Sequence, residues 1–180
     1  MAHPDLVRAS REGDQFHYHW AARQCLELLP GTSDLVSVTI EGPSAKEATG
    51  DDIDAGEELI DVGLYFGAEG RADARLVRYV QLKHSTRRTL EAWTVSGLEK
   101  TIKGFAKRYA ELLGRFAVDD VARRFRFEFT TNRPIDSKVK EAIADLASAA
   151  VPRHSELRRT ILGFTGLDEP LRFSWPPSRR

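Results

Sequence analysis

Two neighbouring β-rich segments carry polar side chains that could bind a metal ion and a phosphate group. Asp61 lies in the first segment, Gln81 and Lys83 lie in the second, and the turn-forming residues 67–74 between them predict a β-hairpin. A turn centred on Arg71 places Asp61 opposite Gln81, and Lys83 then shares their face because strand side chains alternate. A carboxylate, an amide oxygen and an ammonium group would lie within cross-strand contact. The pattern therefore predicts a site for a divalent metal and a phosphate.

The rest of the chain predicts the elements that must position this site. Apolar side chains at helical spacing alternate with runs of strand formers, and Ser96 and Glu99 have the spacing of a capping box. This order predicts an α/β fold in which one mixed sheet has flanking helices. The predicted elements are a helix at 13–29, strands at 35–40, 59–66 and 76–83, a helix at 96–114, a strand at 125–129, and helices at 137–150 and 154–164.

Acidic and basic residues are equal in number, 27 of each, but they are not evenly distributed. Residues 1–66 contain 13 Asp and Glu against 4 Lys and Arg, whereas the remainder contains 14 against 23. This distribution suits a protein that presents metal-binding acids beside a surface for a polyanion. Solvated faces that merely segregate by charge are the alternative.

Composition also bears on compartment and on domain organisation. The single cysteine, Cys25, rules out a disulfide framework and a thiolate zinc site within this sequence, and its helical spacing predicts a core position. We expect a cytoplasmic protein without a membrane partner, because no apolar run resembles a signal peptide or a membrane span. Residues 1–173 are predicted to form a single domain. Prolines and arginines at 174–180 resemble the start of a linker toward a further C-terminal domain.

The order of elements, with Asp61 on the second strand and Gln81 and Lys83 on the third, resembles the PD-(D/E)xK nuclease superfamily. Residues 13–18, 40–42 and 79–85 are more narrowly similar to the double-stranded-DNA endonuclease domain of bacterial antiphage-defence effectors. In those effectors the domain is fused to nucleotide-sensing or NTPase modules. The resemblance covers residues 12–135 and implies a restriction-endonuclease-like αβββαβ core.

The resemblance also implies roles for particular residues. The chain would be a Mg²⁺-dependent endonuclease, with Mn²⁺ as a substitute, that hydrolyses phosphodiester bonds of double-stranded DNA. Asp61, Gln81 and Glu41 would bind the metal, since hard cations prefer oxygen ligands. Lys83 would orient the attacking water or stabilise charge in the transition state. Two departures are plain: Ile60 replaces the proline of the family name, and Gln81 replaces the usual acid.

The third acid of the site stays open at this level. Glu41 ends a predicted strand, and the following Gly42 would let the backbone turn close to a ligand. Glu12 and Asp14 are rivals, because some superfamily members draw an acid from the first helix, although Asp14 could simply be a helix cap. The acidic cluster Asp51–Asp54 is more simply read as part of a solvated loop, and a member of it that reaches the metal is the alternative.

Basic and polar side chains after the hairpin and on the following helix are candidates for phosphate contacts. Such contacts give salt-dependent affinity without sequence preference, and a solvated lysine face is the alternative. His17 and His19 are two residues apart on a predicted helix, so they lie on different faces and predict no joint zinc site. The candidates for DNA binding are His84, Ser85, Thr86, Arg87, Arg88, Lys100, Lys103 and Lys107.

Two hypotheses about function follow. The leading one is a DNA endonuclease domain, the effector of an antiphage defence protein. Uncontrolled cleavage would damage the host, so the resemblance implies a sensor or regulatory domain beyond residue 180 or homo-oligomerisation on activation. The alternative is a catalytically silent nuclease-like module that binds DNA or a protein, because Gln81 brings no negative charge to the site.

Overall fold

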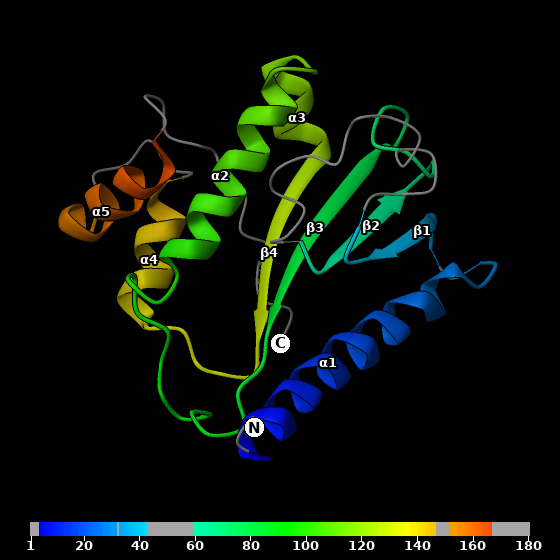
Figure 1. The fold of residues 1–180 in the computed structure, drawn as a ribbon. Coiled ribbons are helices and arrows are strands. Elements are labelled where there is room, and N and C mark those ends of the chain that lie inside the picture. Colours follow the sequence, from blue (N-terminus) through cyan, green and yellow to red (C-terminus); the bar gives the residue numbers. More distant parts are fainter. Residues whose placement is uncertain (1–3, 32, 43–59, 147–151, 167–180) are drawn as a thin grey trace.

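The structure, a computed structural model, describes residues 4–31, 33–42, 60–146 and 152–166, with the side chains of the first helix described from Gly13 onward (Figure 1). It is an α/β fold with one four-stranded mixed sheet flanked by helices, as the sequence predicts. None of the described helices is long and apolar enough to cross a membrane. In chain order the elements are α1 (Pro4–Cys25), the 3₁₀ turn η1 (Leu26–Leu28), β1 (Leu35–Ile40), β2 (Val62–Phe66), β3 (Leu76–Lys83), α2 (Glu99–Leu113), α3 (Val118–Arg124), β4 (Phe125–Thr131), α4 (Ser137–Leu146) and α5 (Ser155–Thr165).

The sheet has the order β1-β2-β3-β4, in which β1, β2 and β3 are antiparallel and β4 is parallel to β3. Val62 pairs with Val80, and the pairing continues to Phe66 and Leu76, so the predicted hairpin and its register are confirmed. The parallel pair requires a long crossover, which α2 and α3 provide. As a consequence, the C-terminal ends of β3 and β4 lie at the same end of the sheet (Figure 1).

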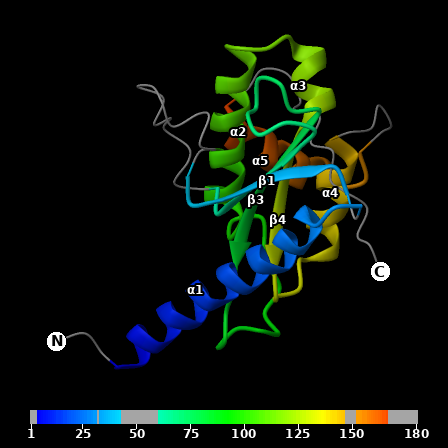
Figure 2. The same cartoon turned by 90° about the vertical axis from the view of Figure 1, so that its right-hand side faces the viewer.

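Helices cover both faces of the sheet, with α1 on one side and α2, α4 and α5 on the other (Figure 2). Alternate residues of the strands feed the two apolar layers. Beneath α1, Ala21 packs with even-numbered strand residues such as Leu64 and Val80. On the opposite face, Tyr79 belongs to a larger cluster with β4 and the other helices.

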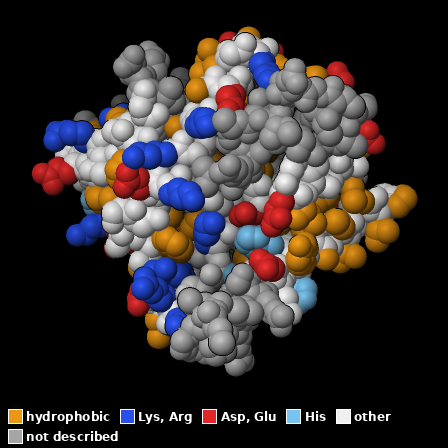
Figure 3. Space-filling view, viewed as in Figure 1, with side chains coloured by type: hydrophobic (Ala, Val, Ile, Leu, Met, Phe, Trp, Pro, Cys, Tyr) orange, Lys and Arg blue, Asp and Glu red, His pale blue; other side chains and the backbone are white. Residues whose placement is uncertain are grey.

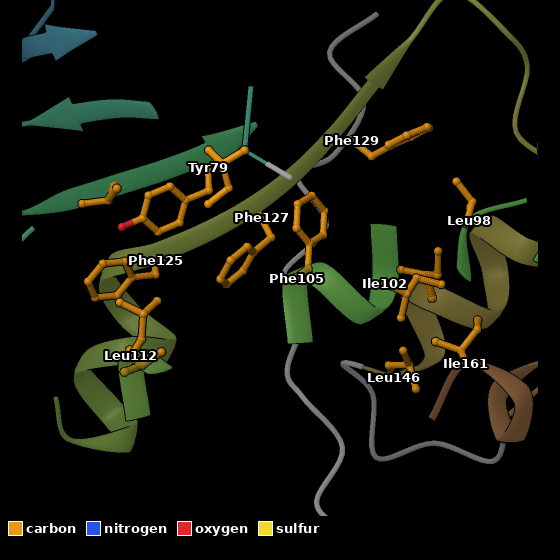
Figure 4. Packing of buried hydrophobic residues seen from close by; sticks show 14 of the residues in the cluster. Tyr79, Leu98, Ile102, Phe105, Leu112, Phe125, Phe127, Phe129, Leu146 and Ile161 are labelled. Atoms are coloured by element: carbon orange, nitrogen blue, oxygen red, sulfur yellow. The ribbon is translucent and has the colours of Figure 1, made fainter. Parts of the chain in front are cut away.

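The larger cluster is centred on aromatic side chains of β4, as the alternating phenylalanines of this strand predict. The Phe127 ring lies 5.3 Å from that of Phe105 and 5.7 Å from that of Tyr79, measured between ring centroids (Figure 4). Phe125 and Phe129 extend the same layer along the strand. These contacts fix α2 against the central strands.

Two ion pairs connect neighbouring elements. Arg78 on β3 donates to both carboxylate oxygens of Glu128 on β4, at 2.5 and 2.7 Å, and these hydrogen bonds raise the pKa of Arg78. At the α4 end, Asp145 accepts hydrogen bonds from the guanidinium and the backbone N–H of Arg153. Those bonds lower the pKa of Asp145, because they stabilise its ionised form.

The structure corrects several details of the predicted elements. The first helix begins at Pro4 rather than at Gly13, since a glycine inside a helix costs only about 1 kcal/mol and does not end it. Cys25 is exposed and not in the core, because α1 ends there and the chain turns into η1. The alternative of a helix cap at Asp14 is also wrong, since this residue lies inside α1.

Two further differences concern the segment after the hairpin. No capping box forms at Ser96: α2 starts after Leu98 without a side-chain cap, and the Ser96 hydroxyl hydrogen-bonds that of Thr94 at 3.1 Å. Helix α3 is absent from the prediction. With seven residues, it is too short to show an apolar period.

Candidate active site

Three adjacent strands bring the predicted metal ligands into one row across the sheet. Ile40 pairs with Val62, so the next residues, Glu41 and Asp61, lie opposite one another, and the Glu41 N–H donates to the Asp61 carbonyl at 3.0 Å. Continuing the β2–β3 register by one residue places Asp61 opposite Gln81. Residues 41, 61 and 81 therefore occupy neighbouring positions at the end of β1, the start of β2 and the C-terminal part of β3.

The two carboxylate oxygens of Asp61 have different surroundings. Oδ2 accepts a hydrogen bond from the Leu82 backbone N–H at 2.5 Å, and the Asp61 N–H donates to the Val80 carbonyl at 3.0 Å. Oδ1 lies 4.0 Å from Nδ1 of His17, and only 14% of the Asp61 side chain is exposed. One oxygen thus fixes the carboxylate against β3, while Oδ1 accepts no hydrogen bond from any described residue.

His17 reaches the same point from the opposite side, out of α1. Its Nε2 lies 3.1 Å from the carbonyl oxygen of Leu82. Both main-chain groups of Leu82, the residue between Gln81 and Lys83, are therefore held by side chains of the site. Nδ1 of His17 is buried and has no hydrogen-bond partner among the described residues.

Gln81 is the most deeply buried member of the row. Its side chain is 1% exposed, and its Oε1 atom accepts no hydrogen bond from any described residue. A buried acceptor without a donor costs about 1–3 kcal/mol, so this position works against the stability of the fold. An amide oxygen in this state is available as a ligand for a hard cation.

Lys83 ends β3 two residues beyond Gln81, pairs with Thr131 of β4 and is exposed. The chain after it is anchored to the end of β4 by two reciprocal hydrogen bonds: Ser85 N–H to the Asn132 side-chain oxygen at 3.0 Å, and the Asn132 amide to the Ser85 carbonyl at 2.8 Å. Lys83 is thus an exposed residue at a strand end that hydrogen bonds hold in place.

The other predicted DNA-binding residues after β3 do not all face solvent as Lys83 does. The imidazole of His84 stacks on Phe16 of α1, with 4.9 Å between ring centroids, so this side chain packs beside α1. Thr86, Arg87 and Arg88 are exposed, and Arg88 lies 3.8 Å from Glu91.

The three predicted lysines of α2 lie together along one groove. This groove has a volume of about 480 Å³ and is lined by Ser96, Gly97, Glu99, Lys100, Lys103, Gly104 and Lys107. Lys103 is paired with Glu99 at 2.6 Å, whereas Lys100 and Lys107 have no ion pair with any described residue. On the face seen in Figure 3, Lys and Arg side chains gather over α2, and Asp, Glu and His side chains gather toward α1.

Of the rival residues for the third acid, only the side chain of Asp14 lies within the described residues. Asp14 is an exposed residue of α1, while the side chain of Glu12 and the whole cluster at 51–54 lie outside the described residues. Among the described residues, no group of three or more His, Cys, Asp and Glu side chains could hold a metal ion. A cation here would therefore depend on Asp61, on Glu41 and the Gln81 amide at the neighbouring strand positions, and on water, since Mg²⁺ commonly keeps several waters.

His17 is the residue of this site that sequence reasoning missed. Its spacing from His19 predicts only that the two rings lie on different faces, and in the structure His17 is partly buried whereas His19 is exposed. Its contact with Leu82 spans 65 residues of sequence, and no local pattern signals such a contact.

Comparison with known proteins adds no family to this description. No protein-family model matches the sequence, and no curated protein matches it at a significant level.

Proposed function

We propose that this chain is a metal-dependent DNA endonuclease domain that hydrolyses phosphodiester bonds. The observation that carries the proposal is the row of Glu41, Asp61 and Gln81 at neighbouring strand positions, with an amide oxygen buried in it that accepts no hydrogen bond from any described residue. Lys83 lies on the same strand as Gln81, two residues further on. Oxygen ligands for a metal ion and a nearby lysine ammonium group are the combination that supports metal-dependent phosphodiester hydrolysis.

The order of elements supports the same reading. A helix, three antiparallel strands, a helical crossover and a strand parallel to the third resemble the restriction-endonuclease-like core of the PD-(D/E)xK superfamily. In that superfamily the acid lies at the start of the second strand and the lysine on the third. Asp61 and Lys83 match these two positions.

Each residue has a task that follows from its surroundings. Asp61 would bind the cation through Oδ1, because Oδ2 is engaged by the Leu82 N–H. Gln81 would add its amide oxygen, and Glu41 its carboxylate from the end of β1. Lys83 would orient the attacking water beside the scissile phosphate or neutralise charge that develops there. The cation, Mg²⁺ or Mn²⁺, would supply Lewis-acid stabilisation of that charge.

The α2 groove supports binding to the DNA backbone. Lys100 and Lys107 are exposed side chains that line this groove, and neither has an ion pair with a described residue. Contacts from lysines to phosphates do not read sequence, and each neutralised phosphate makes affinity more dependent on salt.

The test measures DNA cleavage and its dependence on metal ions. Purified chain is incubated with plasmid and linear duplex DNA in Mg²⁺, Mn²⁺ or EDTA, beside Lys83→Ala, Asp61→Asn and the control Lys140→Ala, whose lysine is exposed on α4. Cleavage should require metal, fall by about 10²–10⁴-fold in Lys83→Ala, and stay unchanged in the control. Cleavage that survives both site variants would refute the proposal.

The wider biological setting belongs to the same proposal. By resemblance, the domain would be the cytoplasmic effector of an antiphage defence protein, controlled by a sensor domain or by homo-oligomerisation. The second candidate is a silent nuclease-like module, which the neutral Gln81 favours. Calorimetry separates the two, because a silent binder needs no metal affinity that depends on Asp61.

A further inference from the structure

The imidazole of His17 is placed as a metal ligand would be. Its Nε2 lies 3.1 Å from the Leu82 carbonyl oxygen, and a carbonyl can only accept a hydrogen bond. Nε2 must therefore carry the proton, and in the neutral ring Nδ1 keeps its lone pair. Metal-binding histidines almost always donate their other N–H in this way, which fixes the tautomer and the orientation of the ring.

This nitrogen lies near the Asp61 oxygen that the Leu82 N–H does not engage. Nδ1 of His17 is buried without a hydrogen-bond partner among the described residues and lies 4.0 Å from Oδ1 of Asp61. That distance is too long for a direct hydrogen bond. It equals roughly twice the usual bond length of about 2.0–2.2 Å to a transition metal, so one ion between the two atoms reaches both.

We propose that His17 is a ligand of the metal site, through Nδ1, and that its nitrogen makes the site favour Mn²⁺ over Mg²⁺. The inference rests on the proposed function, since it concerns the same ion as Asp61. Imidazole suits borderline metals, whereas Mg²⁺ prefers oxygen donors throughout. A site in which the His17 nitrogen lies beside the Asp61 carboxylate therefore departs from the all-oxygen set expected for Mg²⁺.

The test uses Mn²⁺ alone as the probe and needs no DNA. Electron spin-echo envelope modulation of the full chain with Mn²⁺ detects nitrogen bound to the ion, and labelling with ¹⁵N-histidine assigns it to a histidine ring. We expect the nitrogen coupling in the wild type and in His19→Gln, an exposed histidine on the same helix. In His17→Gln the coupling should disappear and Mn²⁺ affinity should fall by at least about 10-fold. Calorimetry should find a much smaller change for Mg²⁺.

The outcomes separate this inference from the proposed function. Mn²⁺ that binds in an Asp61-dependent manner without nitrogen coupling would overturn the role of His17 and leave the metal site standing. Coupling that persists in His17→Gln would overturn it as well. A wild-type chain that binds no Mn²⁺ would overturn both proposals. The ¹⁵N-labelled wild type decides whether a histidine is bound even if His17→Gln fails to fold.

Discussion

Replacing Gln81 by methionine should make the protein more stable and less able to bind metal. The side chain is 1% exposed, and its Oε1 receives no hydrogen bond from described residues. Removing an unsatisfied buried acceptor recovers about 1–3 kcal/mol, while methionine has nearly the same length and adapts to irregular spaces. For a chain of this size, each kcal/mol raises Tm by about 2–4 °C.

Urea unfolding followed by circular dichroism in EDTA measures the difference directly. Gln15→Met is the matched control, because this exposed glutamine should change the free energy of unfolding by less than about 0.5 kcal/mol. Adding Mn²⁺ should then stabilise the wild type more than Gln81→Met, since a ligand that binds the folded state stabilises it. A Gln81→Met protein that is less stable than wild type in EDTA would refute the reasoning, because the amide would then be a structural element of the core.

Two further predictions concern the fold. Phe127→Ala should lower the free energy of unfolding by about 3–5 kcal/mol in denaturant titrations, because the ring packs between Tyr79 and Phe105; a loss below about 1 kcal/mol would contradict the packing described. The hydrogen bonds that lower the pKa of Asp145 give stability that is present above its unfolded pKa of about 4 and is lost as the pH falls through the folded value. Asp145→Asn should therefore flatten the acid limb of a stability profile, and an unchanged limb would show that Arg153 does not stabilise the ionised carboxylate.

The register of the central hairpin and the bounds of its second strand could be predicted because two local signals agree, although β2 begins at Val62 and not at 59. Period-2 alternation marks both strands, and the turn formers between them fix which residues face one another. The same reasoning placed β1 beside the hairpin and the phenylalanines of β4 in the core. It failed where local signals are weak. The first helix begins before Gly13, and α3, with seven residues, is too short to show a repeating apolar pattern.

Residues of the candidate site could be predicted where they share one hairpin, and could not where they come from a distant element. Asp61, Gln81 and Lys83 share one hairpin, so strand geometry alone brings them together. His17 comes from a helix whose position on the sheet depends on packing of Phe16, Trp20 and other residues against the strands. Tertiary placement of this kind leaves no signature in residue spacing. The sequence also could not show that Glu41 and Asp61 are directly opposed, because β1 and β2 are far apart in the sequence.

The peptide unit at Leu82 has a consequence for spectroscopy. Its N–H donates to the Asp61 carboxylate and its carbonyl faces His17, so this one amide proton senses the charge and position of both side chains. A proton held by a carboxylate resonates far downfield and exchanges slowly with solvent for as long as the contact lasts. The Leu82 amide is therefore a natural NMR probe of the site, readable in the intact protein with neither DNA nor a reporter label.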